Sequence, residues 1–223
     1  MAKAKNNHHA GYVCILGQPN VGKSTLLNQI LGVKLAITSP KPQTTRHRIL
    51  GIRSEVDYQI IFLDTPGLMA PHYHLQKVMM KTVIAASADA DVLMFMVEAG
   101  DLLSAIDSEF LQRFKMTGKP LLVIINKIDQ FEKQRLLPLM QTIAQQFQPQ
   151  EIIPISALTK DGLSILLQEV VKYLPVSPPY YPLDMLTKHP ERFFVAEIIR
   201  EKIFYYFGEE IPYSTTVVIE EYR

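Results

Sequence analysis

Residues 17–24 have the types and the spacing of a loop that binds phosphate groups through its backbone. They read Gly-Gln-Pro-Asn-Val-Gly-Lys-Ser, a complete G-x-x-x-x-G-K-[ST] pattern. Gly17 and Gly22 allow a tight turn close to an anion, and successive backbone N–H groups then form an anion nest. Lys23 can reach the β- and γ-phosphates, and the Ser24 hydroxyl is a hard oxygen ligand suited to Mg²⁺. The pattern predicts a nucleoside triphosphate site with a magnesium ion.

A second group, Asp-Thr-Pro-Gly at 64–67, follows a β-rich run directly. A carboxylate at a strand end can orient Mg²⁺, usually through water, and Gly67 lets its N–H approach the γ-phosphate. The hydroxyl of Thr44 or Thr45 can complete the metal site, and the spacing does not decide between them, although we favour Thr45. Such a threonine binds only while γ-phosphate and metal are present, so its loop would act as a switch.

The third group would recognise the base. It reads Asn126-Lys127-Ile128-Asp129. The Asp129 carboxylate can accept hydrogen bonds from N1–H and the 2-amino group of guanine, and a site built on such bonds rejects adenine by roughly 10⁴-fold or more. Asn126 would tie the segment to the phosphate loop, and the Lys127 stem would cover the base plane. Ser156-Ala157 would add a backbone N–H for the guanine carbonyl.

The predicted site therefore gathers residues from four separate segments. For nucleotide contact they are Gly17, Gln18, Pro19, Asn20, Val21, Gly22, Lys23, Ser24, Thr25, Asp64, Thr65, Pro66, Gly67, Leu68, Asn126, Lys127, Ile128, Asp129, Ser156 and Ala157. The metal ligands would be Ser24, Thr45 and Asp64, and the catalytic groups Lys23, Thr45 and Gly67.

The elements that must position these motifs alternate between strands and helices. Strands are expected at 12–16, 92–97, 121–125 and 152–155, a hairpin at 49–53 and 58–63, and helices at 25–31, 75–88, 104–114, 132–147 and 162–174. This order predicts an α/β fold with a mostly parallel sheet, and the hairpin adds one antiparallel edge strand. Ligands of such sheets lie beyond the carboxyl ends of the strands, where all the motifs should converge.

Composition fits a soluble globular protein and excludes several classes. The chain has 223 residues, 48% hydrophobic and 20% charged, with a net charge of +1, so it shows no general affinity for nucleic acid or membranes. Its single cysteine, Cys14, suits a reducing compartment and reads as a small buried hydrophobe. Neither a signal peptide nor an apolar membrane span is present in the sequence, so we expect a cytoplasmic protein. Residues 1–10, with His8 and His9, are expected to form a flexible leader.

The C-terminal part reads differently. Residues 175–182 hold four prolines and predict a stiff, extended linker. Beyond it, 183–223 should form a helix at 191–207 and a strand at 214–219, too little for an independently stable domain. This segment has five Lys/Arg against eight Asp/Glu and no G-x-x-G loop, so it shows no RNA-binding footprint of its own.

With these motifs the chain resembles the translation-factor-related GTPases. It is more closely similar to the bacterial ribosome-assembly GTPases of the TrmE-Era-EngA-like family. The resemblance rests on the residues at 17–28, Pro-Gln-Thr-Thr-Arg-His-Arg-Ile at 42–49, and the groups at 64–67 and 126–129. It extends from about Gly11 to the C-terminus. It implies a phosphate-loop GTPase fold over 11–174, followed over 183–223 by the incomplete start of a KH-like α+β RNA-binding domain.

The resemblance also implies a role. The protein would be a GTP-binding and GTP-hydrolysing switch in small ribosomal subunit assembly and 16S rRNA maturation, with GTP/GDP, 16S rRNA and the small subunit as partners. Peripheral association with the inner face of the membrane and a monomeric state are further expectations. Because the G-x-x-G clamp is missing, we expect a truncated chain that binds RNA poorly.

One position departs from the Ras-like pattern. Leu68 stands where those proteins carry the glutamine that positions the attacking water, so intrinsic hydrolysis should be slow. Asn20 occupies the position that, in similar GTPases, helps to bind a K⁺ ion beside the phosphates. The resemblance therefore implies that K⁺ activates hydrolysis here. Two alternatives stay open. One is a nucleotide-gated binding module with negligible turnover, and the other is a related GTPase acting on another RNA or on a metal carrier.

Overall fold

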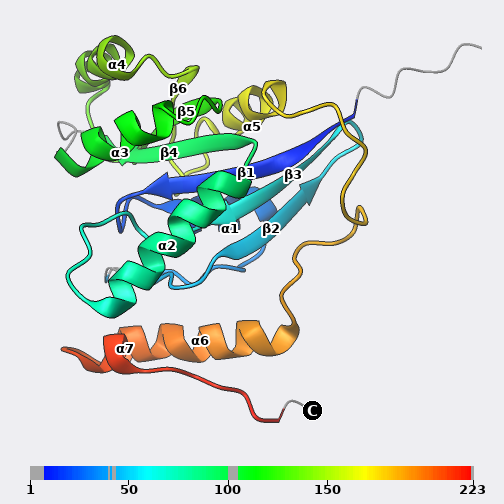
Figure 1. The fold of residues 1–223 in the computed structure, drawn as a ribbon, viewed down its shortest axis with the longest axis vertical. Helices are drawn as coiled ribbons and strands as arrows, with labels where there is room; N and C mark the ends of the chain where they lie inside the picture. Colours follow the sequence, from blue (N-terminus) through cyan, green and yellow to red (C-terminus); the bar gives the residue numbers. More distant parts are fainter. Residues whose placement is uncertain (1–7, 40, 42–43, 100–104, 222–223) are drawn as a thin grey trace, which may run out of the picture.

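The computed structural model describes residues 8–39, 41, 44–99 and 105–221, and its centre is one twisted six-stranded sheet (Figure 1). The strand order is β2-β3-β1-β4-β5-β6. The strands are β1 (His9–Gly17), β2 (Ile49–Ser54), β3 (Tyr58–Asp64), β4 (Val92–Glu98), β5 (Leu121–Asn126) and β6 (Glu151–Pro154). Only β2 is antiparallel to its neighbour, and it lies at the edge, as the hairpin predicted.

Helices cover both faces of this sheet because the central strands are apolar on both sides. The helices are α1 (Lys23–Leu31), α2 (His74–Asp89), α3 (Ala105–Lys115), α4 (Lys133–Phe147), α5 (Leu163–Lys172), α6 (Glu191–Tyr206) and α7 (Ile211–Ser214), with a 3-10 turn η1 (Ile128–Gln130). On one face Val83, Leu111 and Ile143 of α2, α3 and α4 belong to one buried cluster. On the other face, Leu27 of α1 and Leu166 of α5 belong to the second. The predicted α/β architecture is confirmed.

The element boundaries agree with the sequence to within one to three residues, with two corrections. The first concerns the leader, because β1 begins at His9, which pairs with Tyr58 of β3. His8 is buried and its backbone carbonyl accepts from Ser177, so neither histidine belongs to a flexible leader. Ser104, where the third helix was expected to begin, lies outside the described residues.

The second correction concerns 214–219, where a β-branched run predicted a strand. The structure instead places the short helix α7 at Ile211–Ser214, and 215–219 form no strand. Exposure alternates along this segment as in a strand. A strand needs a partner for its backbone N–H and C=O groups, however, and none of the described segments pairs with it.

The proline-rich segment is docked on the sheet rather than free. Gln59 of β3 is fully buried, and its side-chain oxygen accepts from the backbone N–H of Tyr180 and of Tyr181 at 2.8 and 3.0 Å. The Tyr180 ring stacks on Tyr12 with centroids 5.7 Å apart. Residues 175–182 therefore follow a fixed course along the end of the sheet (Figure 1).

The chain then covers the outer edge of β2. The N–H of Ile52 donates to the carbonyl of Leu186 at 2.8 Å, and the Thr187 hydroxyl donates to the carbonyl of Leu50 at 2.7 Å. The N–H of Leu50 donates to Nε2 of His189 at 3.3 Å. These contacts satisfy polar groups that an edge strand would otherwise leave open.

Candidate functional site

The predicted phosphate loop connects β1 to α1, and two of its glycines are required by space and by backbone conformation. Gly17 has φ of 140°, and a Cβ there would lie 2.3 Å from the carbonyl oxygen of Met96. Gly22 has φ of 102°, and its Cβ would lie 2.2 Å from Nδ2 of Asn126. A Cβ would collide with the backbone of Met96 at the first position and with the side chain of Asn126 at the second, so the loop can be this tight only with glycine.

Lys23 lies inside the loop with its ammonium group close to two backbone carbonyls. Nζ donates to the carbonyls of Gly17 and Gln18 at 2.9 and 2.7 Å. Burial lowers the pKa of Lys23 to about 8, and the nearby Asp64 carboxylate acts in the opposite direction. The ammonium group is therefore held at a position where oxygens of a charged ligand could replace the two backbone carbonyls as its hydrogen-bond acceptors.

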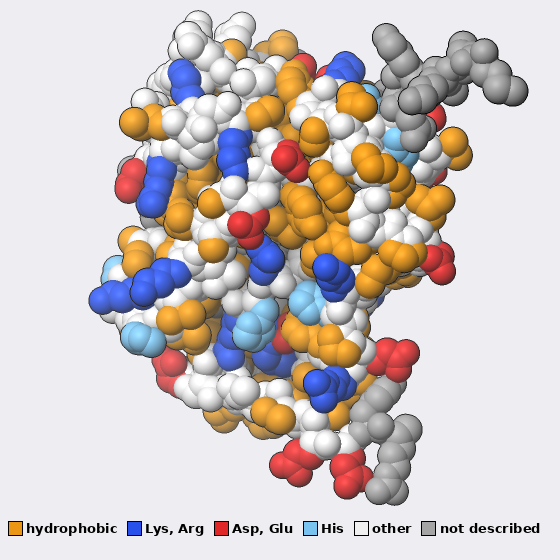
Figure 2. All heavy atoms as spheres, turned by 45° about the vertical axis from the view of Figure 1, so that its right-hand side comes forward, with side chains coloured by type: hydrophobic (Ala, Val, Ile, Leu, Met, Phe, Trp, Pro, Cys, Tyr) orange, Lys and Arg blue, Asp and Glu red, His pale blue; other side chains and the backbone are white. Residues whose placement is uncertain are grey.

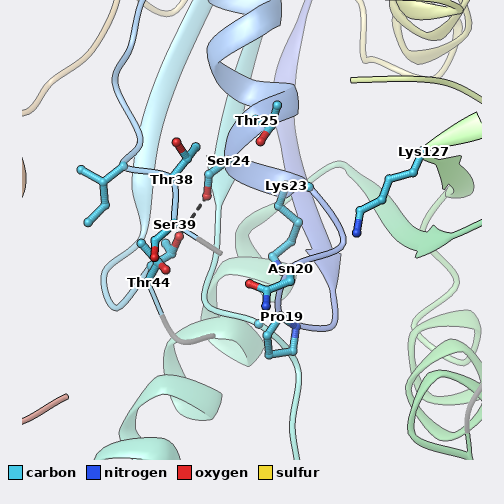
Figure 3. Close-up of a pocket in the computed structure, with 13 residues that line it drawn as sticks. Pro19, Asn20, Lys23, Ser24, Thr25, Thr38, Ser39, Thr44 and Lys127 are labelled. Carbon is cyan, nitrogen blue, oxygen red and sulfur yellow. Dashed lines mark hydrogen bonds between the residues drawn. The ribbon is translucent and has the colours of Figure 1, made fainter. Parts of the chain in front are cut away.

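The three predicted metal ligands are brought together. The Ser24 hydroxyl donates to Oδ2 of Asp64 at 2.8 Å. It also lies 3.0 Å from Oγ1 of Thr45, and the dashed line from Ser24 in Figure 3 marks this contact. Burial raises the pKa of Asp64 to about 6, and its Oδ1 is buried with no hydrogen-bond partner. Two hydroxyls and an unsatisfied carboxylate oxygen form a hard-oxygen set that fits Mg²⁺. The Thr44 hydroxyl instead donates to the carbonyl of Lys41, which supports Thr45 as the ligand.

These groups open into a pocket of about 410 Å³, which we call the phosphate-loop pocket. Its lining residues are Pro19, Asn20, Gly22, Lys23, Ser24, Thr25, Ile37, Thr38, Ser39, Thr44, Thr45, Gly67 and Lys127. In Figure 3, Thr38, Ser39 and Thr44 stand on one side and Lys127 on the other. Sequence reasoning missed Ile37, Thr38 and Ser39 as site residues. Their position just before the predicted switch threonines was the available signal.

Gly67 and Leu68 follow β3 and have different surroundings. A Cβ on Gly67 would lie 2.6 Å from the backbone nitrogen of Pro19, so only glycine allows this approach to the phosphate loop. The N–H of Leu68 donates to the carbonyl of Gly17 at 2.9 Å. Leu68 is 1% exposed and its side chain packs in the hydrophobic core.

The predicted base segment is tied to the phosphate loop through Asn126. Its Nδ2 donates to the carbonyl of Val21 at 2.7 Å, and its Oδ1 accepts from the N–H of Ala157 at 2.9 Å. The N–H of Ser156 donates to the carbonyl of Asp161. The N–H groups of Ser156 and Ala157 thus both have acceptors within the chain, so the expected N–H for a guanine carbonyl gains no support.

The remaining residues of the base segment differ in their surroundings, and Lys127 lines the phosphate-loop pocket. Lys127 has φ of 66°, and its Nζ donates to Glu98 at 2.6 Å. Asp129 is solvent-exposed in η1, where a base could reach it. Ile128 packs against the core and has a structural part in holding the segment.

Other predicted residues support the loop rather than face the pocket. The Thr65 hydroxyl donates to the carbonyl of Ile15 at 2.7 Å and is fully buried. Nε2 of Gln18 donates to Asp107 of α3 at 2.8 Å. Val21 and Pro66 are buried. These contacts fix the backbone of the two loops that carry Lys23 and Gly67.

A contact from the C-terminal part reaches the phosphate-loop pocket and was not predicted. Glu201 of α6, whose side chain is 3% exposed, accepts from Nζ of Lys34 at 2.7 Å and from the N–H of Thr38 at 3.1 Å. Arg46 of the predicted switch loop in turn donates to three backbone carbonyls of the C-terminal part, those of Pro212, Tyr213 and Thr215. The predicted switch loop and the segment around α6 and α7 are therefore packed together.

Among the described residues, no group of three or more His, Cys, Asp and Glu side chains is placed to hold a metal ion. A zinc-type centre thus has no support in this part of the chain, whereas the hydroxyl-rich magnesium set does. No helix in the described ranges is long and apolar enough to cross a membrane.

Comparison with known proteins places this geometry in a family. The family described as "50S ribosome-binding GTPase" matches residues 12–127. The chain is 48% identical to GTPase Era of Syntrophus aciditrophicus over 214 residues, which is 96% of this chain and 70% of that protein. It is 45% identical to the chloroplastic GTPase ERA-like protein of Oryza sativa, covering 97% of this chain and 52% of that protein.

Solved structures agree with the sequences. A crystal structure of Era in complex with MgGDPNP and nucleotides 1506–1542 of 16S ribosomal RNA has a TM-score of 0.89 and 44% identity, covering 93% of this chain and 70% of that one. A point variant of Aquifex aeolicus Era bound to GDP·AlF4⁻ has the same TM-score and identity over 92% and 70%. With the phosphate loop, the metal-ligand set and these matches together, the chain belongs to the Era family of GTPases.

Proposed function

We propose that this GTPase binds GTP with Mg²⁺ at the phosphate-loop pocket and works as a nucleotide-dependent switch. The observation that carries the proposal is the convergence of Ser24, Thr45 and Asp64 beside Lys23. Three separate segments bring two hydroxyls and a carboxylate together next to a buried cation, and one oxygen of that carboxylate has no hydrogen-bond partner. The similar Era structure with MgGDPNP supports the same nucleotide and metal for this chain.

The magnesium ion would be held by Ser24 and Thr45 hydroxyls and by Asp64, directly or through water. When bound, it supplies positive charge that offsets the charge developing on the phosphate oxygens. Thr45 reaches this set from the predicted switch loop, so its bond depends on the nucleotide that is present.

Hydrolysis joins a water oxygen to the γ-phosphorus as the bond from that phosphorus to the β–γ bridging oxygen breaks, giving GDP and phosphate. Lys23 would exchange its carbonyl acceptors for β- and γ-phosphate oxygens, and the N–H of Gly67 would donate to the γ-phosphate. Leu68 is buried and cannot orient water, so we expect a slow intrinsic rate. We propose that K⁺ held by Asn20, which lines the pocket, supplies charge that a Ras-like protein obtains from an arginine finger.

The guanine specificity is assigned to Asp129. Calorimetry with GDP and ADP on the wild type and on Asp129→Asn tests it. We expect tight GDP binding, no detectable ADP binding, and loss of the GDP preference in the variant. An asparagine can accept from N1–H and donate to a 2-carbonyl, so the variant should gain affinity for xanthosine diphosphate. Equal binding of GDP and ADP by the wild type would overturn the guanine site.

For partners, we propose the small ribosomal subunit and its 16S rRNA, with a role in subunit assembly. The support is the Era structure that contains 16S rRNA nucleotides. We divide the chain into a GTP-binding domain at 11–174, a connecting segment at 175–182 and a KH-like part at 183–223. A monomeric state and loose peripheral contact with the inner membrane face complete the proposal. Gel filtration and vesicle flotation would check the last two.

A further inference from the structure

A second, smaller pocket lies outside the phosphate-loop pocket, between the predicted switch loop and α6. It has a volume of about 60 Å³. Arg46 and His47 line it from the loop, Glu197 and Arg200 from α6, and Thr216 from the C-terminal segment. None of these residues lines the phosphate-loop pocket. On the face drawn in Figure 2, Lys, Arg and His side chains gather around a hollow in the lower half of the view.

Arg200 brings an unsatisfied cationic donor to this pocket. The residue is 4% exposed, and its Nε and Nη2 donate to the two carboxylate oxygens of Glu197 at 2.9 and 2.6 Å. Its Nη1 is buried and has no hydrogen-bond partner. A guanidinium has five N–H donors and no acceptor, so Nη1 can donate to an acceptor bound in the pocket that Arg200 lines.

Arg46 adds a second guanidinium with no charge partner of its own among the described residues. Its hydrogen bonds go to three backbone carbonyls, at 2.7 to 2.9 Å. The two guanidiniums lie near the same ring, with their Cζ atoms 5.9 and 5.6 Å from the centroid of Phe204. Burial and the positive charge of Arg200 lower the pKa of Arg46, and the carboxylate of Glu197 acts in the opposite direction. With the single carboxylate of Glu197, the pocket holds a surplus of one positive charge.

We propose that this pocket binds a phosphate-type oxyanion carrying about one negative charge. The Nε and Nη2 donors of Arg200 and the Nη donors of Arg46 already have acceptors in the chain, so the contact would come from Nη1 of Arg200. A charged guanidinium N–H forms a strong, charge-assisted hydrogen bond to a phosphate oxygen. A volume of about 60 Å³ exceeds what one water needs and suits a small tetrahedral anion. His47 and Thr216 are exposed at the mouth, so the oxyanion can come from free phosphate or from a phosphodiester of an RNA chain.

The site would join the predicted switch loop to α6, which lies far from it in sequence. Arg46 and His47 directly follow Thr45, whose hydroxyl lies 3.0 Å from that of Ser24 in the proposed metal site. An oxyanion between Arg46 and Arg200 would therefore fasten the nucleotide-sensitive loop to α6 by bonds that neither nucleotide nor metal provides. This inference goes beyond GTP binding, and its test is independent of hydrolysis.

The experiment uses the full chain saturated with GDP and Mg²⁺, so that the phosphate loop is already filled. Calorimetry and ³¹P NMR measure binding of inorganic phosphate against chloride at constant ionic strength. We expect saturable binding by the wild type. The double variant Glu197→Met with Arg200→Met removes the ion pair as a unit, a replacement that buried pairs often tolerate. It should weaken phosphate binding at least about tenfold, a loss equivalent to about 1.4 kcal/mol.

The matched control is Arg192→Gln, an exposed arginine on the same helix that should leave phosphate binding unchanged. Arg46→Lys, which keeps the charge and replaces the guanidinium by an ammonium group, carries the test if circular dichroism shows that the double variant is unfolded. A short oligoribonucleotide with hydroxyl ends distinguishes the sources. If the oligoribonucleotide competes with inorganic phosphate, the natural ligand is a phosphodiester of RNA. If it does not compete, the natural ligand is a free anion. No saturable binding by the wild type, or equal binding by the variants, would overturn the site and leave water as the partner of Nη1.

Discussion

The carboxylate of Glu201 accepts a hydrogen bond from the backbone N–H of Thr38 at 3.1 Å, across 163 residues of sequence. Thr38 lines the phosphate-loop pocket, so α6 holds part of the pocket wall in place. The same carboxylate forms an ion pair with Lys34, but the Lys34 side chain is exposed, so this pair contributes little to stability. The nearly complete burial of Glu201 makes its bond to the Thr38 N–H the stronger restraint.

The Glu201→Gln variant should release GDP faster. A bond to a charged acceptor contributes about 1.5 to 3 kcal/mol, and the amide retains part of it. We expect an acceleration of roughly tenfold, equivalent to about 1.4 kcal/mol, measured by displacement of a fluorescent GDP analogue. Glu220→Gln, in the exposed C-terminal segment, is the matched control. Equal release rates for both variants would show that α6 does not restrain the pocket.

Replacing Thr45 by valine should weaken the binding of a GTP analogue in Mg²⁺ and affect GDP much less. The hydroxyl that lies 3.0 Å from Ser24 is lost while the side-chain shape is kept. A loss of about tenfold corresponds to about 1.4 kcal/mol, read by titration at several Mg²⁺ concentrations. Thr44→Val, which removes a hydroxyl bonded to the carbonyl of Lys41, should behave nearly as the wild type. The reverse ranking would assign the metal to Thr44.

Introducing a glutamine at position 68, as Ras-like proteins have, should not make GTP hydrolysis rapid. The Leu68 side chain is 1% exposed, so the amide would be buried without partners at a cost of about 1 to 3 kcal/mol. Leu68→Gln should therefore melt at a lower temperature with an unchanged or reduced rate of GTP hydrolysis. Leu68→Met, which conserves the volume, is the control. A faster rate in the glutamine variant would mean that the side chain can turn out of the core.

Potassium should accelerate hydrolysis at least about tenfold over sodium at equal ionic strength, because a cation beside the phosphates offsets developing charge. The Asn20→Ala variant should lose this difference and hydrolyse GTP at its sodium rate in both salts. Phosphate release in the two salts measures the effect. Equal wild-type rates would remove K⁺ from the proposal.

Acid should destabilise the protein through His189. Burial is the largest cause that lowers its pKa below the ordinary 6.5, while its Nε2 accepts from the N–H of Leu50 and its ring stacks on Phe193. The unfolded chain then binds more protons, so the contribution to stability is complete above pH 6.5 and is lost as pH falls toward the lowered value. Urea denaturation followed by circular dichroism at pH 5 and 8 should show a smaller difference in His189→Gln. The same pH dependence in both proteins would contradict this.

The phosphate loop could be read from the sequence because its chemistry is local. Gly17 and Gly22 are required by backbone conformation and by close neighbours. The run at 92–97 is equally clear, since a strand buried on both faces is apolar throughout.

The rest depends on partners that a local pattern does not contain. His9 joins β1 because Tyr58 of β3 offers it a pairing position. Residues 214–219 have the composition of a strand and fail to form one because no neighbouring strand in the described part of the chain meets them. The bond between Glu201 and Thr38, and the place of Thr38 in the pocket wall, follow from packing across the whole chain.

The contacts between β2 and 186–189 also bear on how this protein behaves in a crowded solution. An open edge strand is a template to which another chain can add its own strand, which begins aggregation. Here the outward N–H groups of Leu50 and Ile52 already have acceptors in His189 and Leu186. The segment that leads to α6 thus also protects the edge of the sheet from pairing with another chain. A chain cut after residue 182 would expose the backbone N–H groups of this edge strand and would aggregate more readily.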